Sequence, residues 1–119
     1  LNINAVKGIS FGDGFAAAGM KGSEHNDEWH SNNLGVGTRT NHSGGIIGGM
    51  STGEDINIQV AFKPTSTIGK EQNTVNHLEE NVTIAATGRH DPCVLPRAVP
   101  IVEAMCALAI MDLILESKS

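Results

Sequence analysis

Residues 88–100 read Gly-Arg-His-Asp-Pro-Cys-Val-Leu-Pro-Arg-Ala-Val-Pro and join a β-branched run to the longest apolar stretch of the chain. The run before them, residues 82–87, predicts a strand, and the apolar stretch after them predicts a helix. Three prolines restrict the backbone of this junction. The junction also carries Arg89, His90, Asp91 and Arg97, more ionisable groups than a plain connection needs. We therefore expect chemistry where the strand gives way to the helix.

The helix is expected over residues 97–116, with Pro100 tolerated in its first turn. Its apolar positions nearly encircle the helix axis: Ile101, Val102, Met105, Ala107, Leu108, Ala109, Ile110, Leu113 and Ile114. A helix of that kind is buried inside a larger body or against a partner. The chain offers too little other apolar surface to cover it, so we expect a partner surface.

Composition bounds the size and class of the protein. The chain has 119 residues and 39% hydrophobic residues, with 14 glycines, three Phe and one Trp, so its core has to be built from small aliphatic side chains. It begins with Leu1, inside an apolar run, which leads us to expect a fragment or a processed piece of a longer protein.

Charge and cysteine content narrow the partners and the compartment. A net charge of -5 disfavours nucleic acid and anionic membrane as partners. The apolar run at residues 104–111 is bracketed by Glu103 and Asp112, and it is shorter than the ~20 residues of a membrane span, so a soluble protein is expected. Cys93 and Cys106 lack metal or redox spacing and are predicted to be free, buried thiols in a reducing cytoplasm.

The first third of the chain alternates short elements with turns. We expect a strand at residues 1–6, a glycine-marked break at 7–14, a short helix at 15–20 and a polar surface loop at 21–42. His25, Asp27 and His30 in that loop could contribute to a metal site. A solvated loop is favoured instead, because no fourth ligand lies at a spacing typical of zinc.

The middle of the chain contains two features suited to ligand binding. Residues 41–53 include five glycines, which permit positive φ angles and close approach of a ligand or backbone. A strand predicted at residues 54–62 ends in Lys63-Pro64 and three hydroxyl side chains, which suit a phosphate or polar ring atoms, although an ordinary Ser/Thr loop would look the same. Residues 69–80 are expected to be a polar connection.

Three motifs in this order resemble the C-terminal third of chorismate synthase: Ser-Gly-Gly-Ile-Ile-Gly-Gly-Met-Ser-Thr-Gly at 43–53, Ala-Phe-Lys-Pro-Thr-Ser at 61–66 and Gly-Arg-His-Asp-Pro-Cys-Val at 88–94. The resemblance covers essentially the whole chain. It implies an α+β fold, a β-α-β sandwich in which helices pack between two antiparallel sheets. This chain would hold only the C-terminal portion of that single domain, residues 1–119.

The resemblance implies a lyase of the shikimate pathway of aromatic amino-acid biosynthesis. Such an enzyme converts 5-enolpyruvylshikimate 3-phosphate to chorismate by anti-1,4-elimination of phosphate, and it requires reduced FMN, with NADPH as the reductant in bifunctional relatives. It also implies a cytoplasmic homotetramer, with the N-terminal part of the same enzyme as a further partner. Membrane and nucleic acid are not expected as partners.

The resemblance also assigns roles to residues of this sequence. Arg89 would be shared between flavin and substrate, and Asp91 would handle the proton at flavin N5, so these two are the catalytic candidates. The predicted cofactor contacts are Asn4, Ala5, Gly48, Lys63, Pro64, Thr65, Ser66, Thr67 and Arg89. Two alternatives stay open, a surface salt bridge for Arg89 and a turn or helix cap for Asp91.

The family's two catalytic histidines and most of its substrate-binding arginines belong to the N-terminal part. No such role is therefore given to His25, His30, His42, His77 or His90. We expect this chain alone to be inactive. Two other functions remain open: a flavin- or phosphate-binding module without catalysis, and an interaction segment that completes a partner chain.

Overall fold

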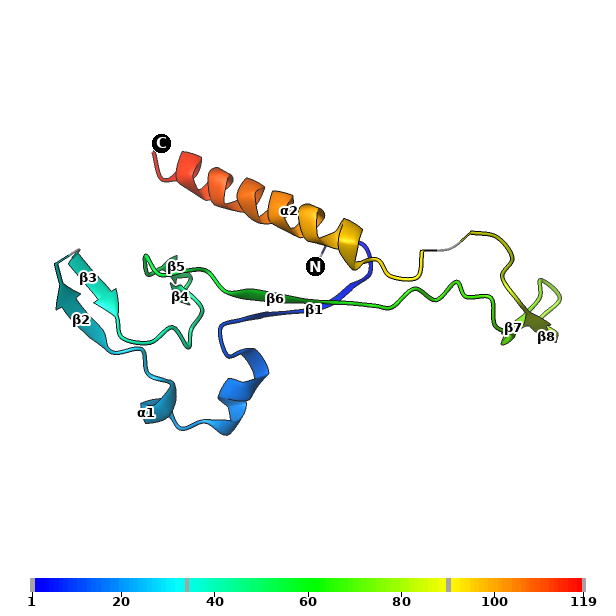
Figure 1. The fold of residues 1–119 in the computed structure, drawn as a ribbon, viewed down its shortest axis with the longest axis horizontal. Coiled ribbons are helices and arrows are strands. Elements are labelled where there is room, and N and C mark those ends of the chain that lie inside the picture. The colour runs from blue at the N-terminus through cyan, green and yellow to red at the C-terminus, as the bar shows by residue number, and fades with distance from the viewer. Residues whose placement is uncertain (1, 34, 90, 119) are drawn as a thin grey trace. The chain divides into compact units, whose positions relative to one another are not determined.

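The computed structural model describes residues 2–33, 35–89 and 91–118. Leu1 and His90, which figured in the sequence predictions, lie outside the described residues, as does Leu34. Contacts within the chain define two compact units, Leu1–Phe62 and Lys63–Ser119. Short antiparallel strand pairs and helices give a mixed α+β composition, as expected (Figure 1).

The first unit is organised around the antiparallel pair of β1 (Val6–Phe11) and β6 (Ile58–Phe62). Val6 lies opposite Phe62 and Phe11 lies opposite Ile58, with an irregularity in the register between Val6 and Gly8. Along β6 the apolar residues are half-buried and the intervening residues are exposed, as period-two alternation predicts. The strand prediction is confirmed over residues 58–62, but it began four residues too early.

The start of the chain differs from the prediction. Residues 3–5 form bends and turns, and Ala5 has a φ of +67°, so the strand begins at Val6 rather than at residue 1. The expected break at residues 7–14 is wrong up to Phe11, because Gly8 pairs with Ala61 inside the ladder. Gly12, with a φ of +54°, is where the strand ends. The short helix expected at 15–20 is present as the 3-10 helix η1 (Gly14–Gly19).

The polar stretch at residues 21–42 is more ordered than the predicted loop. It contains a short helix, α1 (Gly22–His25), and an antiparallel hairpin of β2 (Trp29–Asn32) and β3 (Gly35–Thr38). Trp29 and Val36 are largely exposed, so the hairpin has little apolar face to produce an alternating sequence pattern. Periodicity therefore gave no strand signal there.

The glycine-rich stretch adopts the backbone that its composition predicted. β4 (Ile46–Ile47) and β5 (Met50–Ser51) form a small hairpin whose turn is Gly48-Gly49, both with positive φ. Gly44 has a φ of +68° and packs against the backbone of Gly12, so closely that an added Cβ would lie 2.2 Å from the Gly12 nitrogen. This contact joins the glycine-rich stretch to the end of β1.

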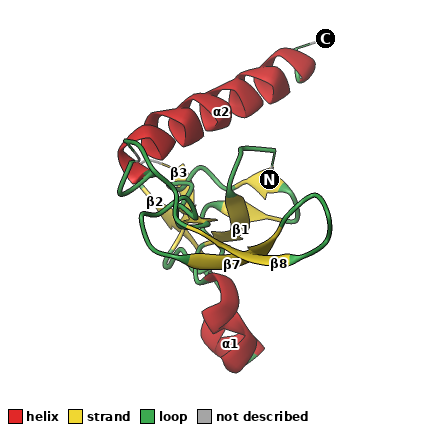
Figure 2. Cartoon of the chain, turned by 90° about the vertical axis from the view of Figure 1, so that its right-hand side faces the viewer, coloured by secondary structure: helices red, strands yellow, loops and turns green. Residues whose placement is uncertain are grey.

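The second unit contains a hairpin and a long helix. β7 (Gln72–Val75) pairs antiparallel with β8 (Asn81–Ile84), as Figure 2 shows, so the connection predicted at 69–80 includes a strand and the strand predicted at 82–87 ends at Ile84. α2 (Leu95–Glu116) begins two residues before the predicted start, so Pro96 lies in its first turn and Pro100, predicted there, lies inside the helix instead. The predicted strand-to-helix junction is confirmed.

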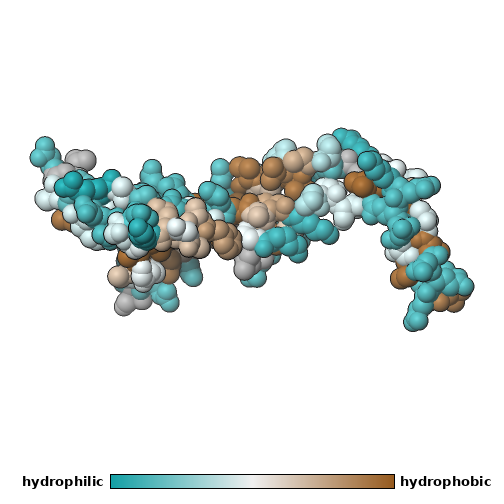
Figure 3. Space-filling model, turned by 90° about the horizontal axis from the view of Figure 1, so that it is seen from below, coloured by the Kyte–Doolittle hydropathy of each residue, from teal (hydrophilic) through white to brown (hydrophobic). Residues whose placement is uncertain are grey.

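α2 exposes most of its apolar residues within its own unit; Ala98 is its buried residue. Apolar residues are visible at the surface in Figure 3. By length and composition α2 could cross a membrane, so the length argument from residues 104–111 was wrong, since the helix continues through both flanking acids. An acidic side chain near the middle of a membrane span costs about 3 kcal/mol. Glu103 lies in that part of α2, which favours a protein cover.

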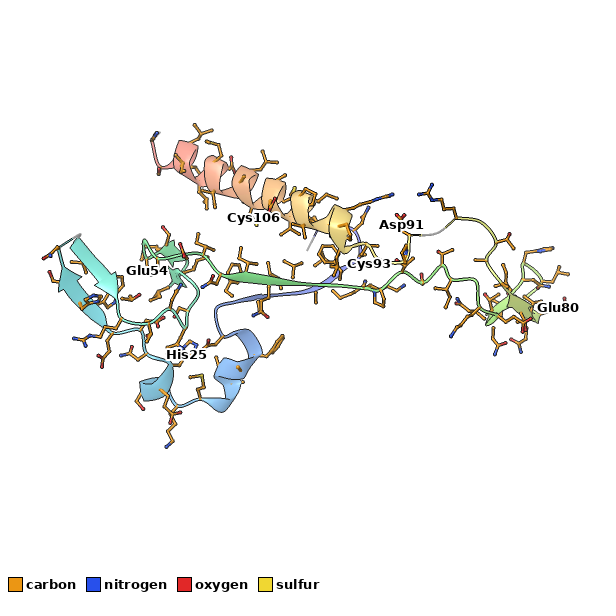
Figure 4. The ribbon with its side chains drawn as sticks, in the orientation of Figure 1. His25, Glu54, Glu80, Asp91, Cys93 and Cys106 are labelled. Carbon is orange, nitrogen blue, oxygen red and sulfur yellow. The ribbon has the colours of Figure 1, made fainter. Side chains whose placement is uncertain are left out.

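Both cysteines are free thiols, as predicted. Cys93 is exposed and Cys106 is half-buried, so the expectation that both are buried is wrong. Cys93 lies in the loop before α2, whereas Cys106 lies on the helix itself (Figure 4).

The contact between Gly44 and Gly12 predicts a large effect of a single methyl group. Gly44→Ala should lower the free energy of unfolding by about 3 kcal/mol or more, because backbone strain adds to overpacking. Gly48→Ala is the matched control, since Gly48 also has a positive φ of +60° but nothing within 4 Å of an added Cβ. It should cost only about 1 kcal/mol.

Chemical denaturation followed by the fluorescence of Trp29 measures both variants. Equal losses of unfolding free energy in Gly44→Ala and Gly48→Ala would show that the close contact between Gly44 and Gly12 does not constrain the fold.

Candidate functional site

A hollow of about 550 Å³ opens in the second unit, where the loop before α2 meets the segment at residues 65–67. Its lining combines hydroxyl, guanidinium and carboxylate groups with one apolar side chain: Thr65, Thr67, Arg89, Asp91, Val94 and Arg97. Four of these residues are candidates from the sequence, namely Thr65, Thr67, Arg89 and Asp91. The structure therefore brings together the two catalytic candidates and part of the predicted cofactor segment.

Asp91 is held by Arg97 through both carboxylate oxygens. Arg97 Nη1 lies 3.0 Å from Asp91 Oδ2, and Nη2 lies 3.4 Å from Oδ1. The side chains are 42% exposed for Asp91 and 77% exposed for Arg97, and ion pairs in such settings contribute only about 0–1 kcal/mol to stability. The alternative of a helix cap is wrong for Asp91, because Val94 is the N-cap of α2 and no side chain caps it.

Arg89 is exposed and forms no ion pair with any residue that the structure describes. The alternative reading as a surface salt bridge is therefore not supported. With Arg97 and Asp91, Arg89 gives the hollow two formal positive charges and one negative charge. The hollow is thus locally positive in a chain of net charge -5, which suits an anionic ligand.

The segment at residues 63–67 follows β6 as irregular backbone. Lys63, Pro64, Ser66 and Thr67 are exposed, and the Ser66 carbonyl accepts a hydrogen bond of 3.2 Å from Gln72 Nε2 on β7. Thr65 is half-buried, and its Oγ1 is buried without a partner among the described residues. A buried hydroxyl without a partner costs free energy, so a ligand atom that bonds it would recover that cost.

The remaining predicted contacts belong to the first unit. Asn4 and Ala5 lie in the turn that precedes β1 rather than on the strand itself. Ala5 is one of the non-glycine residues with positive φ, a conformation that is often retained for a functional reason. Gly48 lies at the exposed turn between β4 and β5, where an added Cβ would meet nothing within 4 Å.

Asp27, one of the three candidate metal ligands, has a structural task instead. It is 6% exposed, and its Oδ1 accepts hydrogen bonds from Thr40 Oγ1 at 2.6 Å and from the His42 amide at 2.9 Å. Its Oδ2 accepts one from the Ser43 amide at 2.9 Å. Within residues 2–33, 35–89 and 91–118, no group of three His, Cys, Asp or Glu residues could hold a metal ion.

Two opposing effects act on the pKa of Asp27. Burial raises it, but the hydrogen bonds from Thr40, Ser43 and His42 together outweigh burial and hold the pKa well below its usual value. Asp27 therefore stays charged and ties the start of the glycine-rich stretch to the region before β2. The prediction of a solvated loop is wrong at this residue.

A histidine pair lies beside this carboxylate network. His42 Nδ1 lies 2.7 Å from Asp13 Oδ2, and His25 Nε2 lies 3.9 Å from the same oxygen. The centroids of the two rings are 5.5 Å apart. The group joins α1, the turn after β1 and the glycine-rich stretch. Separately, His30 on β2 has a buried Nδ1 without a hydrogen-bond partner among the described residues.

Two residues with clear contacts in the structure were not predicted to have them: Arg97 at the hollow in the second unit and Asp27 in the first unit. Arg97 was noted in the junction but was not among the site residues, although its spacing of six from Asp91 could have suggested a contact across the start of α2. The role of Asp27 had no local signal, because its partners lie 13 to 16 residues away in sequence.

Comparison with known proteins places the chain in one family. The family model described as chorismate synthase matches residues 1–115. Chorismate synthase of Porphyromonas gingivalis is 57% identical over 120 residues, covering 100% of this chain and 33% of the relative. The chloroplastic chorismate synthase of Capnoides sempervirens is 58% identical over 113 residues, covering 94% of this chain and 25% of the relative.

A solved structure agrees with these relatives. A crystal structure of chorismate synthase superposes with a TM-score of 0.52 at 39% identity, covering 55% of this chain and 20% of that one. The chain thus spans about a third, or less, of the length of the curated relatives it matches.

The hydrogen bonds of Asp27 predict that Asp27→Ala destabilises the chain by about 3 kcal/mol, because it leaves two part-buried amide N–H groups without their acceptor. The contribution of Asp27 should be complete above its unfolded pKa of about 3.8 and should be lost as the pH falls through the lower folded value. Glu28→Ala is the control, because the Glu28 side chain is 69% exposed, and it should change stability by no more than about 0.5 kcal/mol.

Chemical denaturation at pH 7 and below pH 4 measures both variants. If Asp27→Ala were as stable as Glu28→Ala at pH 7, the proposed structural role of Asp27 would be wrong.

Proposed function

Because this chain belongs to the chorismate synthase family, we propose that it forms the C-terminal segment of a single enzyme domain that converts 5-enolpyruvylshikimate 3-phosphate to chorismate. One observation carries the proposal beyond the family match. The second unit holds a locally positive hollow that is lined by both catalytic candidates and by Thr65, whose buried hydroxyl has no hydrogen-bond partner among the described residues.

The reaction removes phosphate and a ring hydrogen in an anti-1,4-elimination. A ring C–O bond breaks, and its electron pair leaves with the phosphate. A ring C–H bond also breaks, so a second ring double bond forms without net oxidation or reduction. Transition-state charge therefore develops on the phosphate oxygens, where fixed cationic donors stabilise it most effectively.

The lining of the hollow fits reduced FMN and the anionic substrate. Arg89 supplies a planar set of donors that stays charged and matches phosphate or carboxylate oxygens. Thr65 and Thr67 offer hydroxyls. Lys63, which precedes them on the same segment but does not line the hollow, is proposed to offset negative charge. Bound there, reduced FMN would supply electron density to the ring as the phosphate departs, and Arg89, Lys63 and the two threonines would hold it. NADPH is the proposed reductant in bifunctional members of the family.

The remaining residues are assigned positioning or proton-handling roles. Asp91 is proposed to hold or move the proton at flavin N5, because it supplies a carboxylate to the lining of the hollow and a carboxylate can act as a general acid or base. Asn4, Ala5 and Gly48 are proposed flavin contacts from the first unit. Pro64 and Ser66 complete the segment proposed to wrap the cofactor.

The exposed apolar surface of α2 supports a role for the rest of the enzyme as partner. We propose that α2 is covered by the N-terminal part in a sandwich of two antiparallel sheets with helices between them, and that the complete enzyme is a homotetramer. A protein cover for α2 is consistent with a cytoplasmic enzyme. Nucleic acid and membrane are not proposed as partners.

The same surface favours one second function. The chain could act as an interaction segment that completes a partner, since α2 has apolar residues on all sides and little cover in its own unit. A third function, flavin binding without catalysis, would be recognised by tight FMN binding in a full-length protein that forms no chorismate.

The proposed reaction predicts that the full-length protein, with reduced FMN under anaerobic conditions, forms chorismate from 5-enolpyruvylshikimate 3-phosphate. This chain alone should form none, and mixing it with the N-terminal part should restore the reaction. The absorbance of chorismate measures all three samples. Chorismate formation at an enzymatic rate by the isolated chain would contradict the proposed division of the site.

Arg89 should be needed for cofactor binding. In the full-length protein, Arg89→Gln should weaken FMN binding about tenfold, because a charge-assisted hydrogen bond of about 1.5 kcal/mol is lost. Arg39→Gln is the matched control, since Arg39 forms an exposed pair with Glu28 at 3.9 Å outside the hollow. Anaerobic titration of flavin absorbance gives both dissociation constants, and an unchanged constant for Arg89→Gln would remove Arg89 from the cofactor site.

A further inference from the structure

We propose that Arg97 is the positioning residue of the reaction, which acts by holding the carboxylate of Asp91 in one orientation. The inference rests on the proposed function, because it assumes that Asp91 handles a proton. Arg97 itself is not proposed to contact the flavin or the substrate.

The geometry of the pair supports an indirect role. Both terminal nitrogens of Arg97 face the carboxylate, Nη1 at 3.0 Å from Oδ2 and Nη2 at 3.4 Å from Oδ1. A guanidinium that uses both of these nitrogens on one carboxylate fixes the plane of that carboxylate, whereas a lysine ammonium acts as a point charge. Arg97 therefore places one donor on each oxygen of Asp91, while Arg89 on the same hollow has no ion pair among the described residues.

The backbone around Asp91 and around Arg97 explains why the Asp91 side chain needs a partner to fix its orientation and why Arg97 is placed to fix it. Pro92 restricts the backbone of Asp91 to extended conformations but leaves its side chain free to rotate. Arg97 lies in the first turn of α2, where its amide donates to the Val94 carbonyl at 3.0 Å. The next residue, Ala98, is 5% exposed, so the turn that carries Arg97 is packed in place.

Helix stability does not explain an arginine at this position. A cation in the first turn of a helix is disfavoured by the helix dipole, and the first turn of α2 contains no acidic residue. The exposed pair adds little to stability. A residue that breaks a local rule without a gain in stability is a candidate for function, and the contact that Arg97 makes is to the proposed proton-handling group.

The test is a double-mutant cycle in the full-length protein, with Asp91→Asn, Arg97→Gln and the double variant. We expect Arg97→Gln to lower kcat about tenfold and Asp91→Asn to lower it about 100-fold, with no further loss in the double variant. The KM for the substrate should stay within about threefold in Arg97→Gln, because Arg97 is not a ligand. Arg97→Lys should remain well below the parent in kcat, since it keeps the charge but loses the paired donors.

Crystal structures of the full-length parent and of Arg97→Gln give a readout that is independent of activity. The parent should show the two contacts to Asp91, and the variant should show the carboxylate turned away from its parental position. Arg39→Gln, an exposed arginine outside the hollow, is the control and should change neither kcat nor the orientation of Asp91. Thermal unfolding checks that each variant is folded. If Arg97→Gln does not fold, Arg97→Lys takes its place in the kinetic and crystallographic comparison.

Four outcomes would overturn the inference while leaving the proposed function intact: additive losses in the double variant, full activity of Arg97→Lys, a KM effect of Arg97→Gln as large as its kcat effect, or an unmoved Asp91. A parent protein that forms no chorismate would instead overturn the proposed function, and this inference with it.

Discussion

The need to cover α2 is the constraint on which this account depends. The helix has apolar residues on all sides, yet within its own unit it buries little beyond Ala98. Exposing so much apolar surface to water is unfavourable by roughly 25 cal/mol for each Å². The chain covers 33% of the length of the Porphyromonas gingivalis relative, and the proposed function assigns the cover of α2 to the rest of the enzyme.

Covering α2 would also complete the site, because the hollow lies where the helix begins. A second surface there would exclude water around Arg89, Asp91 and Arg97. Charge interactions strengthen several-fold when the effective dielectric constant falls. The Asp91–Arg97 pair, which contributes little to stability while exposed, would therefore interact more strongly in the closed enzyme. The same change would favour binding of a multiply anionic substrate. Folding and function would then share one requirement, the partner surface over α2.

The sequence predicted the parts of the fold that depend on local pattern. The alternation of Ile58, Val60 and Phe62 marked β6, and the proline-rich junction marked the start of α2 to within two residues. The sequence did not predict structure that depends on long-range contacts. Asp27 is an example, because its hydrogen-bond partners are Thr40, His42 and Ser43. Within the hollow, the motifs identified Arg89, Asp91 and the threonines. Arg97 was missed because its role depends on side-chain geometry rather than on residue type.

The most direct test of the central claim is a crystal structure of the full-length protein with FMN and 5-enolpyruvylshikimate 3-phosphate bound. We expect Arg89 and the hydroxyls of Thr65 and Thr67 to lie within about 3.2 Å of flavin or substrate oxygens, with α2 buried by the N-terminal part. A structure in which flavin and substrate bind elsewhere, with the hollow open to solvent or filled by protein, would contradict it.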